Sequence, residues 1–236
     1  MQGGLVDSGS HQETMADYLS SVQWAARDTT PMQATTLGPV LPVEVGPVQE
    51  REVVEAAKAT KWDKACGSDA IPADFWKAIC CRDSPARAWA VALCQKCWED
   101  GEIPDSWHES LVITIFKKGD ASLCENYRPI CLLQAGYKLF AALLLRRLKR
   151  AGAEDRIWRT QFGFKSKHGT TDAIFIARRK LEEAFARENK PLVLLALDWA
   201  KAFDSVMPDA LIEALRRFRL PSKMLDIVPA FCSSRS

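Results

Sequence analysis

The stretch that most constrains the fold is an unbroken apolar run, Leu192–Leu197, which follows Pro191 and ends at Asp198. A short apolar run without charges is typical of a strand that is buried on both faces. Because burial of an isolated carboxylate is costly, Asp198 is expected at the exposed end of this strand, in an ion pair, or on a metal ion. Phosphoryl-transfer enzymes hold divalent cations with carboxylates at such strand ends. The run alone leaves an alternative open, in which Asp198 caps the next helix.

The residues after the run narrow these alternatives. From Asp198 to Val206 the chain reads Asp-x-x-x-Ala-Phe-Asp-Ser-Val, which resembles the first catalytic motif of reverse transcriptases, above all those of non-LTR (LINE-type) retrotransposons. The resemblance implies that Asp198 binds the catalytic magnesium ion, with the backbone carbonyl of Trp199 as a further ligand. It implies that Phe203 lies under the nucleotide sugar and excludes a ribose 2′-hydroxyl group. Asp204 is expected to make structural hydrogen bonds.

A second match lies in a predicted β-hairpin. The β-branched run Leu111–Phe116 predicts one strand, and Asn126–Leu133 predicts the strand that returns. Lys117 and Lys118 in the turn and Arg128 in the second strand can converge on a triphosphate or on a nucleic-acid backbone. By itself Lys-Lys-Gly-Asp is an ordinary solvated turn. Followed by Asn-Tyr-Arg-Pro-Ile-x-Leu-Leu, it resembles the fingers hairpin of the LINE-type enzymes.

The segment Gln161–Ile174 is the third match. LINE-type enzymes carry Gln-x-Gly-Phe, a basic stretch and then Thr-Thr-Asp-Ala at the start of a long helix, and the same order is present here. Thr170 or Thr171 is expected to cap that helix, which runs to about Arg187. The resemblance assigns nucleotide or template binding to three residues of the loop: Gln161, Gly163 and Lys165.

Periodic apolar residues predict helices in most of the remaining chain. Ser84 followed by Pro85 is a typical helix start. Cys94 and Cys97 lie inside that predicted helix, where a buried face is a simpler explanation than a zinc site, because two further ligands are missing nearby. The predicted helices are Val48–Thr60, Ala73–Ile79, Pro85–Trp98, Tyr137–Arg150, Met207–Phe218 and one that starts at Pro221.

The predicted helix Tyr137–Arg150 ends in a cluster of cations: Arg146, Arg147, Lys149 and Arg150. Cations at a helix C-terminus interact favourably with the helix dipole, so the cluster can be purely structural. The sequence leaves open the alternative that these side chains contact template phosphates.

Charge is unevenly distributed along the chain. Residues 1–110 contain 9 Lys/Arg and 17 Asp/Glu, whereas residues 111–190 contain 17 Lys/Arg and 8 Asp/Glu. A basic middle region fits a phosphate-rich partner. No apolar run reaches the length of a membrane span, and the N-terminus lacks the basic and apolar regions of a secretory signal. The eight cysteines are therefore expected to be reduced thiols, and the protein to be intracellular, either nuclear or cytoplasmic.

The resemblance covers roughly residues 50–236 and implies an α+β chain with the right-hand polymerase fold, in which helices pack on a small antiparallel sheet. It implies an RNA-directed DNA polymerase that uses Mg²⁺, an RNA template, a DNA primer and deoxynucleoside triphosphates, while the oligomeric state stays open. The expected organisation is a flexible N-terminal tail (1–46), a helical region ahead of the fingers (47–110), the fingers (111–190) and a partial palm (191–236).

The second catalytic motif of the family, aromatic-Ala-Asp-Asp, is absent, since the sequence contains no Asp-Asp pair. Two-metal phosphoryl transfer needs more than one carboxylate around the ions. The chain is therefore expected to be a fragment truncated before that motif and to be inactive on its own. The alternative is a noncatalytic, truncated remnant that at most binds nucleic acid.

Overall fold

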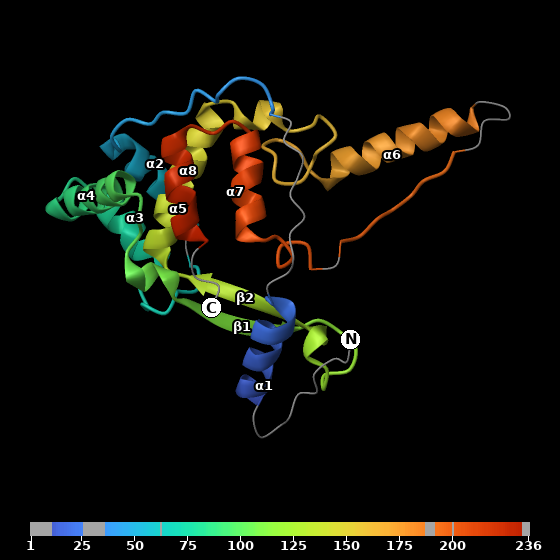
Figure 1. Cartoon of the computed structure of the whole chain (residues 1–236), viewed down its shortest axis with the longest axis horizontal. Coiled ribbons are helices and arrows are strands. Elements are labelled where there is room, and N and C mark those ends of the chain that lie inside the picture. Colours follow the sequence, from blue (N-terminus) through green and yellow to red (C-terminus); the bar gives the residue numbers. More distant parts are fainter. Residues whose placement is uncertain (1–10, 26–35, 62, 187–191, 200, 233–236) are drawn as a thin grey trace.

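The structure is a computed structural model that describes residues 11–25, 36–61, 63–186, 192–199 and 201–232. Its described elements make a mixed α+β chain, in which helices accompany one two-stranded antiparallel sheet (Figure 1). In chain order they are α1 (His11–Tyr18), η1 (Leu19–Gln23), α2 (Glu50–Ala59), α3 (Ala73–Cys81), α4 (Pro85–Asp100), η2 (Asp105–His108), β1 (Ser110–Phe116), η3 (Cys124–Asn126), β2 (Tyr127–Leu133), α5 (Ala135–Arg150), η4 (Ala153–Arg156), α6 (Thr170–Phe185), α7 (Pro208–Arg217), α8 (Ser222–Ile227) and η5 (Val228–Phe231).

The main hydrophobic core lies among helices α2, α3, α4, α5 and α8. Phe140 and Leu143 on the predicted apolar face of α5 are buried, as are Met224 and Ile227 of α8. Full burial of one such side chain stabilises the fold by about 1.5–3 kcal/mol. Among the helices that the structure describes, none combines the length and the hydrophobicity that a membrane crossing requires.

Helix α4 begins at Pro85, as the sequence predicts, and ends at Asp100, two residues beyond the predicted end at Trp98. The Ser84 hydroxyl accepts a hydrogen bond from the Arg87 backbone N–H (3.3 Å), and Gly101 ends the helix in the left-handed conformation at φ 74°. Cys94 and Cys97 are buried, and burial raises the pKa of Cys94 to about 12 and that of Cys97 to about 11. Both therefore stay protonated at neutral pH, which confirms the prediction of a packed helix face.

The predicted hairpin is also confirmed. Strands β1 and β2 pair antiparallel from Ser110 opposite Leu133 to Phe116 opposite Tyr127. The pairing continues into the turn, where the Lys117 backbone N–H donates to the Asn126 carbonyl (2.8 Å).

The predicted buried strand Leu192–Leu197 is wrong for this structure. Residues 192–199 have no regular secondary structure, and their side chains are exposed, Val193 to 88%. A strand buried on both faces needs a neighbouring strand for its backbone and packed side chains on each face. In the described part of the chain the strands β1 and β2 pair only with each other. The apolar run therefore finds neither kind of partner here.

The N-terminal segment departs from the predicted flexible tail. Met15, Tyr18 and Leu19 are buried in a small second core together with Cys124 at the end of the hairpin. Their spacing gives one short helical face, which the surrounding Gly, Pro and Thr residues obscured. Residues 1–10 and 26–35 of the predicted tail lie outside the described residues.

Residues 36–48, which we call the strap, run along the helical core. Leu41, Val43 and Val48 are buried in that core. The Leu37 N–H donates to the Arg217 carbonyl (2.8 Å), and the Leu41 N–H donates to the Arg219 carbonyl (2.9 Å). The strap thus joins the N-terminal part of the chain to the end of α7.

The N-cap of helix α6 lies one residue before the first of the two predicted caps, Thr170 and Thr171. Thr170 is its first helical residue, so Gly169 occupies the N-cap position, and its N–H donates to the Asp172 carboxylate (2.8 Å). Capping by Thr170 or Thr171 is therefore wrong. Helix α6 and residues 192–199 project from the rest of the molecule (Figure 1).

Gly67 lies against the junction between β2 and α5, and we expect Gly67→Ala to lower the free energy of unfolding by about 2–3 kcal/mol. An added Cβ atom would lie 2.7 Å from the Gln134 nitrogen and 2.9 Å from the Leu133 carbonyl carbon, both backbone atoms that cannot rotate away. Urea denaturation measures the effect. Gly163→Ala is the control, since its nearest neighbour would be 3.6 Å away. Equal stability of the two variants would contradict this packing.

Candidate functional site

The segment after Asp198 forms a compact turn at residues 201–206. The Ser205 N–H and the Ser205 hydroxyl both donate to the Lys201 carbonyl, at 3.0 and 2.9 Å, and the Val206 N–H donates to the Phe203 carbonyl at 3.3 Å. Lys201 has a φ of 50°, a left-handed conformation that lysine rarely adopts. The turn presents Phe203 outward, 73% exposed.

A second predicted site segment meets this turn. Phe164 packs edge-on against Phe203, with 5.8 Å between ring centroids. Phe164 belongs to the 161–169 loop, in which the Gln161 side-chain amide donates to the Gly163 carbonyl (3.2 Å). The structure therefore brings Phe203 into contact with Phe164, the residue that follows Gly163 in the loop.

Backbone strain concentrates in these two segments. Six described non-glycine residues have positive φ, and three of them are Phe164, Lys167 and Lys201. Such conformations cost on the order of 1–3 kcal/mol each and persist only when their surroundings enforce them. They cluster at functional sites in proteins generally, which makes this pair of loops the best candidate site.

Asp198 and Trp199 are exposed, next to this turn in the sequence. The Asp198 carboxylate forms no hydrogen bond or ion pair with any residue that the structure describes. The described residues also contain no group of three or more His, Cys, Asp or Glu side chains that could hold a metal ion. Asp198 alone supplies one carboxylate, so these residues do not fit a complete divalent-cation site.

The hairpin cations are exposed and available. Lys117 and Lys118 lie in the turn between β1 and β2, and Arg128 lies on β2 opposite Ile115. Neither they nor Lys165 form an ion pair with a described residue. Hydrogen bonds from Ser122 hold the pKa of the Asp120 carboxyl below its usual value, so Asp120 stays ionised and offsets part of the positive charge of the turn. The three hairpin cations have no ion-pair partner among the described residues and are open to an anionic ligand.

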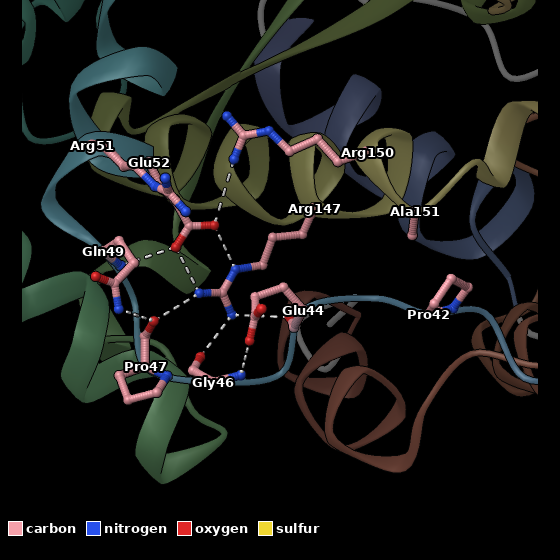
Figure 2. Close-up of a pocket in the computed structure, with 10 residues that line it drawn as sticks. All are labelled: Pro42, Glu44, Gly46, Pro47, Gln49, Arg51, Glu52, Arg147, Arg150 and Ala151. Atoms are coloured by element: carbon pink, nitrogen blue, oxygen red, sulfur yellow. Dashed lines mark hydrogen bonds and ion pairs between the residues drawn. The ribbon is translucent and has the colours of Figure 1, made fainter.

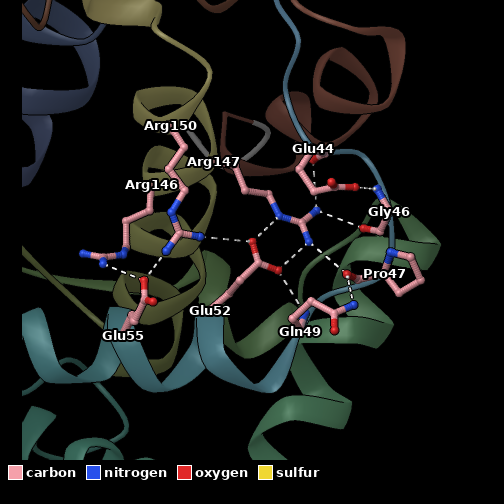
Figure 3. Close-up of polar contacts among 9 residues, drawn as sticks. All are labelled: Glu44, Gly46, Pro47, Gln49, Glu52, Glu55, Arg146, Arg147 and Arg150. Atoms are coloured by element: carbon pink, nitrogen blue, oxygen red, sulfur yellow. Dashed lines mark hydrogen bonds and ion pairs between the residues drawn. The ribbon is translucent and has the colours of Figure 1, made fainter.

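The four cations at the end of α5, by contrast, are all engaged within the protein, and Figure 3 shows the three arginines among them. Their partners are Glu55 for Arg146 and Arg150, Glu52 for Arg147, and Glu154 for Lys149. Of the two alternatives for this cluster, the structure favours the structural one.

Arg147 is the centre of this network and is only 1% exposed. Its Nε and Nη2 donate to the two carboxylate oxygens of Glu52 at 2.8 and 2.7 Å. The remaining donors reach backbone carbonyls of the strap, those of Glu44 (3.3 Å), Gly46 (3.1 Å) and Pro47 (3.1 Å). The guanidinium also lies over the Trp98 ring, 4.7 Å from its centroid.

A pocket of about 370 Å³ opens beside Arg147, between the strap and the end of α5 (Figure 2). It contains none of the residues predicted to bind nucleotide or template. Burial acts to raise the pKa of Glu52, but hydrogen bonds from Arg147 and the Gln49 N–H outweigh it and hold the pKa below its usual value. The arrangement is a buried ion pair that fixes the strap on the helices.

Sequence reasoning missed one set of residues at the site. Trp24 and Gln23 donate to the two carboxylate oxygens of Asp204, and Lys201 donates to the Tyr18 hydroxyl. The structural role predicted for Asp204 is confirmed. The available signal was the helical spacing of apolar residues in 15–19, which did not indicate what that face would contact.

Comparisons with known proteins show the family to which the chain belongs. The family model "Reverse transcriptase (RNA-dependent DNA polymerase)" matches residues 115–235, just over half of the chain. That range contains every predicted site residue.

Three curated proteins are similar to the chain. "Probable RNA-directed DNA polymerase from transposon BS" of Drosophila melanogaster is 27% identical over 87% of the chain and 22% of its own length. "Transposon TX1 uncharacterized 149 kDa protein" of Xenopus laevis is 30% identical over 73% of the chain and 13% of its own length. "RNA-directed DNA polymerase from mobile element jockey" of Drosophila melanogaster is 33% identical over 58% of the chain and 15% of its own length. The chain thus spans less than a quarter of these relatives.

Proposed function

Because the chain belongs to the reverse transcriptase (RNA-dependent DNA polymerase) family, we propose that it forms the fingers and the first part of the palm of a LINE-type RNA-directed DNA polymerase. The complete enzyme would extend a DNA primer on an RNA template. In that reaction the primer 3′-hydroxyl attacks the α-phosphate of a deoxynucleoside triphosphate and pyrophosphate leaves, so the protein contributes chiefly positioning and charge neutralisation.

The observation that carries the proposal is the meeting of Phe203 with the 161–169 loop. Phe203 is proposed to contact the nucleotide sugar, with Gln161 and Gly163 placing nucleotide and template beside it. Four cations that form no ion pair with a described residue are proposed to hold phosphate, namely Lys117, Lys118, Arg128 and Lys165. We place the region ahead of the fingers at residues 47–110, the fingers at 111–190 and the partial palm at 191–236.

Asp198 and the Trp199 carbonyl are proposed as ligands of Mg²⁺ in the complete enzyme. The bound ion would neutralise charge that develops on the phosphoryl group. A complete site requires carboxylates beyond those of the described residues. This requirement favours a second candidate function for the 236-residue chain itself, namely nucleic-acid binding without catalysis.

Binding of single-stranded RNA by the purified chain separates these candidates from an unrelated function. We expect the affinity to fall steeply with salt concentration and to depend little on sequence. Replacing Lys117 and Lys118 by glutamine should reduce the slope of log K against log salt concentration by about 0.7 for each phosphate that is no longer neutralised. The matched control is Lys58→Gln with Lys61→Gln, which changes net charge equally at exposed positions ahead of the fingers. Equal slopes for the two double variants would contradict a role for the hairpin.

Primer extension distinguishes the two candidates from each other. Magnesium-dependent incorporation of deoxynucleotides on an RNA template by this chain would exclude the noncatalytic remnant. Since both candidates allow RNA binding without incorporation by this chain, the deciding preparation is a polypeptide that contains it together with the full set of catalytic carboxylates. Incorporation by that polypeptide would support the polymerase, and its absence there would support the remnant.

A further inference from the structure

The residues 11–24, which we call the arm, comprise α1, η1 and Trp24 and hold the 201–206 turn at two points. The Trp24 indole N–H donates to one carboxylate oxygen of Asp204 (3.0 Å), and the Gln23 side-chain amide donates to the other (3.3 Å). At the start of the turn the Lys201 ammonium donates to the Tyr18 hydroxyl (2.8 Å) and lies 5.0 Å from the centroid of the Tyr18 ring. Phe203 lies between these two anchored residues.

The opposite side of the arm is fixed to the hairpin (Figure 1). Met15 and Leu19 are buried with Cys124, and the partly buried Val112 packs against the same cluster. The Tyr127 ring contacts His11 edge-on, with 5.8 Å between centroids. The arm therefore connects the hairpin, whose turn and second strand carry the candidates Lys117, Lys118 and Arg128, to the turn that carries Phe203.

This connection bears on the geometry of the turn. Lys201 has positive φ, a conformation that persists only where surrounding contacts enforce it. The contacts described for this turn come from the arm on one side and from Phe164 on the other. Charge-assisted hydrogen bonds to both oxygens of Asp204 restrict the residue next to Phe203 most directly.

We propose that the arm is a positioning element for the nucleotide site, in which Trp24 and Gln23 act through Asp204 to fix the Phe203 ring relative to the hairpin. The arm thereby sets how strictly deoxynucleotides are selected over ribonucleotides. The role in nucleotide selection rests on the proposed function, whereas the coupling between the arm and the 201–206 turn does not.

Amide hydrogen exchange of the 236-residue chain tests the coupling without any catalysis. Trp24→Phe keeps an aromatic ring but removes the indole donor. Because this removes a hydrogen bond to a charged group, we expect exchange at the Ser205 and Val206 amides to rise about tenfold. Trp89→Phe is the matched control, since Trp89 lies on α4, is 56% exposed and stacks on Trp76, away from the 201–206 turn. Unchanged exchange at residues 201–206 in Trp24→Phe would overturn the proposal.

A second variant distinguishes a local effect on the 201–206 turn from unfolding of the whole chain. Asp204→Asn keeps the side-chain volume but removes the charge that both donors share. Thermal melting establishes that each variant is folded, and the double variant with Trp24→Phe should show little more exchange than either single variant, because both act on one interaction. Additive effects would show that Trp24 does not act through Asp204.

Nucleotide discrimination separates positioning from simple stabilisation. In primer extension by a polypeptide that contains this chain and the full set of catalytic carboxylates, Trp24→Phe should lower the ratio of kcat/KM for a deoxynucleotide to that for the matching ribonucleotide, with RNA binding unchanged. Trp89→Phe should leave that ratio unaltered. An unchanged ratio in an active Trp24→Phe enzyme would overturn the role in selection. If no form of the protein extends primers, the proposed function fails, and the exchange data still decide whether the arm positions the turn.

Discussion

Replacing Arg147 by methionine is expected to lower the free energy of unfolding by about 3–5 kcal/mol, because the buried Glu52 carboxylate loses its bidentate partner and keeps only Arg150, at 3.8 Å, as an ion-pair partner. Methionine can occupy much of the same volume, so the destabilisation comes from polar groups and not from a cavity. Glu52 would remain buried without its bidentate donor, and three strap carbonyls would lose hydrogen bonds. The strap would keep its apolar contacts and its hydrogen bonds to residues outside this network, which are Arg217, Arg219, Gln95 and Arg156.

Urea denaturation followed by circular dichroism measures this effect. Arg178→Ala is the control, since Arg178 on α6 is 77% exposed and pairs with Glu182 at the surface. Exposed pairs of this kind contribute about 0.2–1 kcal/mol. The double variant Arg147→Met with Glu52→Gln should recover part of the stability, because no unpaired charge remains. Equal stability of Arg147→Met and Arg178→Ala would contradict a buried ion pair.

The ion pair between Arg147 and Glu52 also makes the free energy of unfolding depend on pH, and the pKa of Glu52 fixes the direction of that dependence. The pKa of Glu52 is lower in the folded protein than its usual value of 4.5, so the unfolded chain binds the proton more tightly. The stabilisation is present above pH 4.5 and is lost as the pH falls through the lower, folded-state pKa. Denaturation at several acidic pH values should show this decrease in the wild-type protein and a smaller one in Arg147→Met.

The second large effect concerns catalysis. In a polypeptide that contains this chain and the full set of catalytic carboxylates, Asp198→Asn is expected to lower the rate of primer extension by at least about 100-fold, because it removes one charged ligand of the proposed metal site. Stability should change by less than about 0.5 kcal/mol, because Asp198 is exposed and has no partner among the described residues.

Thermal melting and RNA-templated primer extension of the same preparations measure the two quantities. Asp209→Asn is the control, an equal change of charge at an exposed position in the first turn of α7. Abolished extension with unchanged melting would identify Asp198 as functional. Primer extension at the wild-type rate by Asp198→Asn would show that the metal ligand is assigned to the wrong residue.

Elements whose formation depends on residues close to them in the sequence could be predicted from the sequence. Ser84 with Pro85 specifies the start of α4, and the β-branched run before Lys117 specifies β1, because caps, turns and strand propensity act over a few residues. The site residues in the 161–169 loop and the 201–206 turn were found in the same way, since each lies in a short segment that resembles a family motif. Their roles stay predictions.

Features that depend on distant partners could not be predicted. The apolar run before Asp198 indicates burial, but local pattern carries no information about which strand or helix would cover it. The charge of Arg147 suggested a helix-end cation, whereas its burial depends on Glu52, 95 residues away. Trp24 acquires a role only because Asp204 reaches it in the folded chain.

The strap is synthesised long before the residues that it binds, which affects when it can fold. Its N–H groups at Leu37 and Leu41 bond to carbonyls at Arg217 and Arg219, which a ribosome adds about 180 residues later. At roughly 5–20 residues per second, that interval is on the order of 10–40 seconds. During it the apolar side chains of Leu41 and Val43 have no completed site to enter. This early segment of the chain can therefore complete its contacts only after α7 has been made, and its apolar side chains stay uncovered until then.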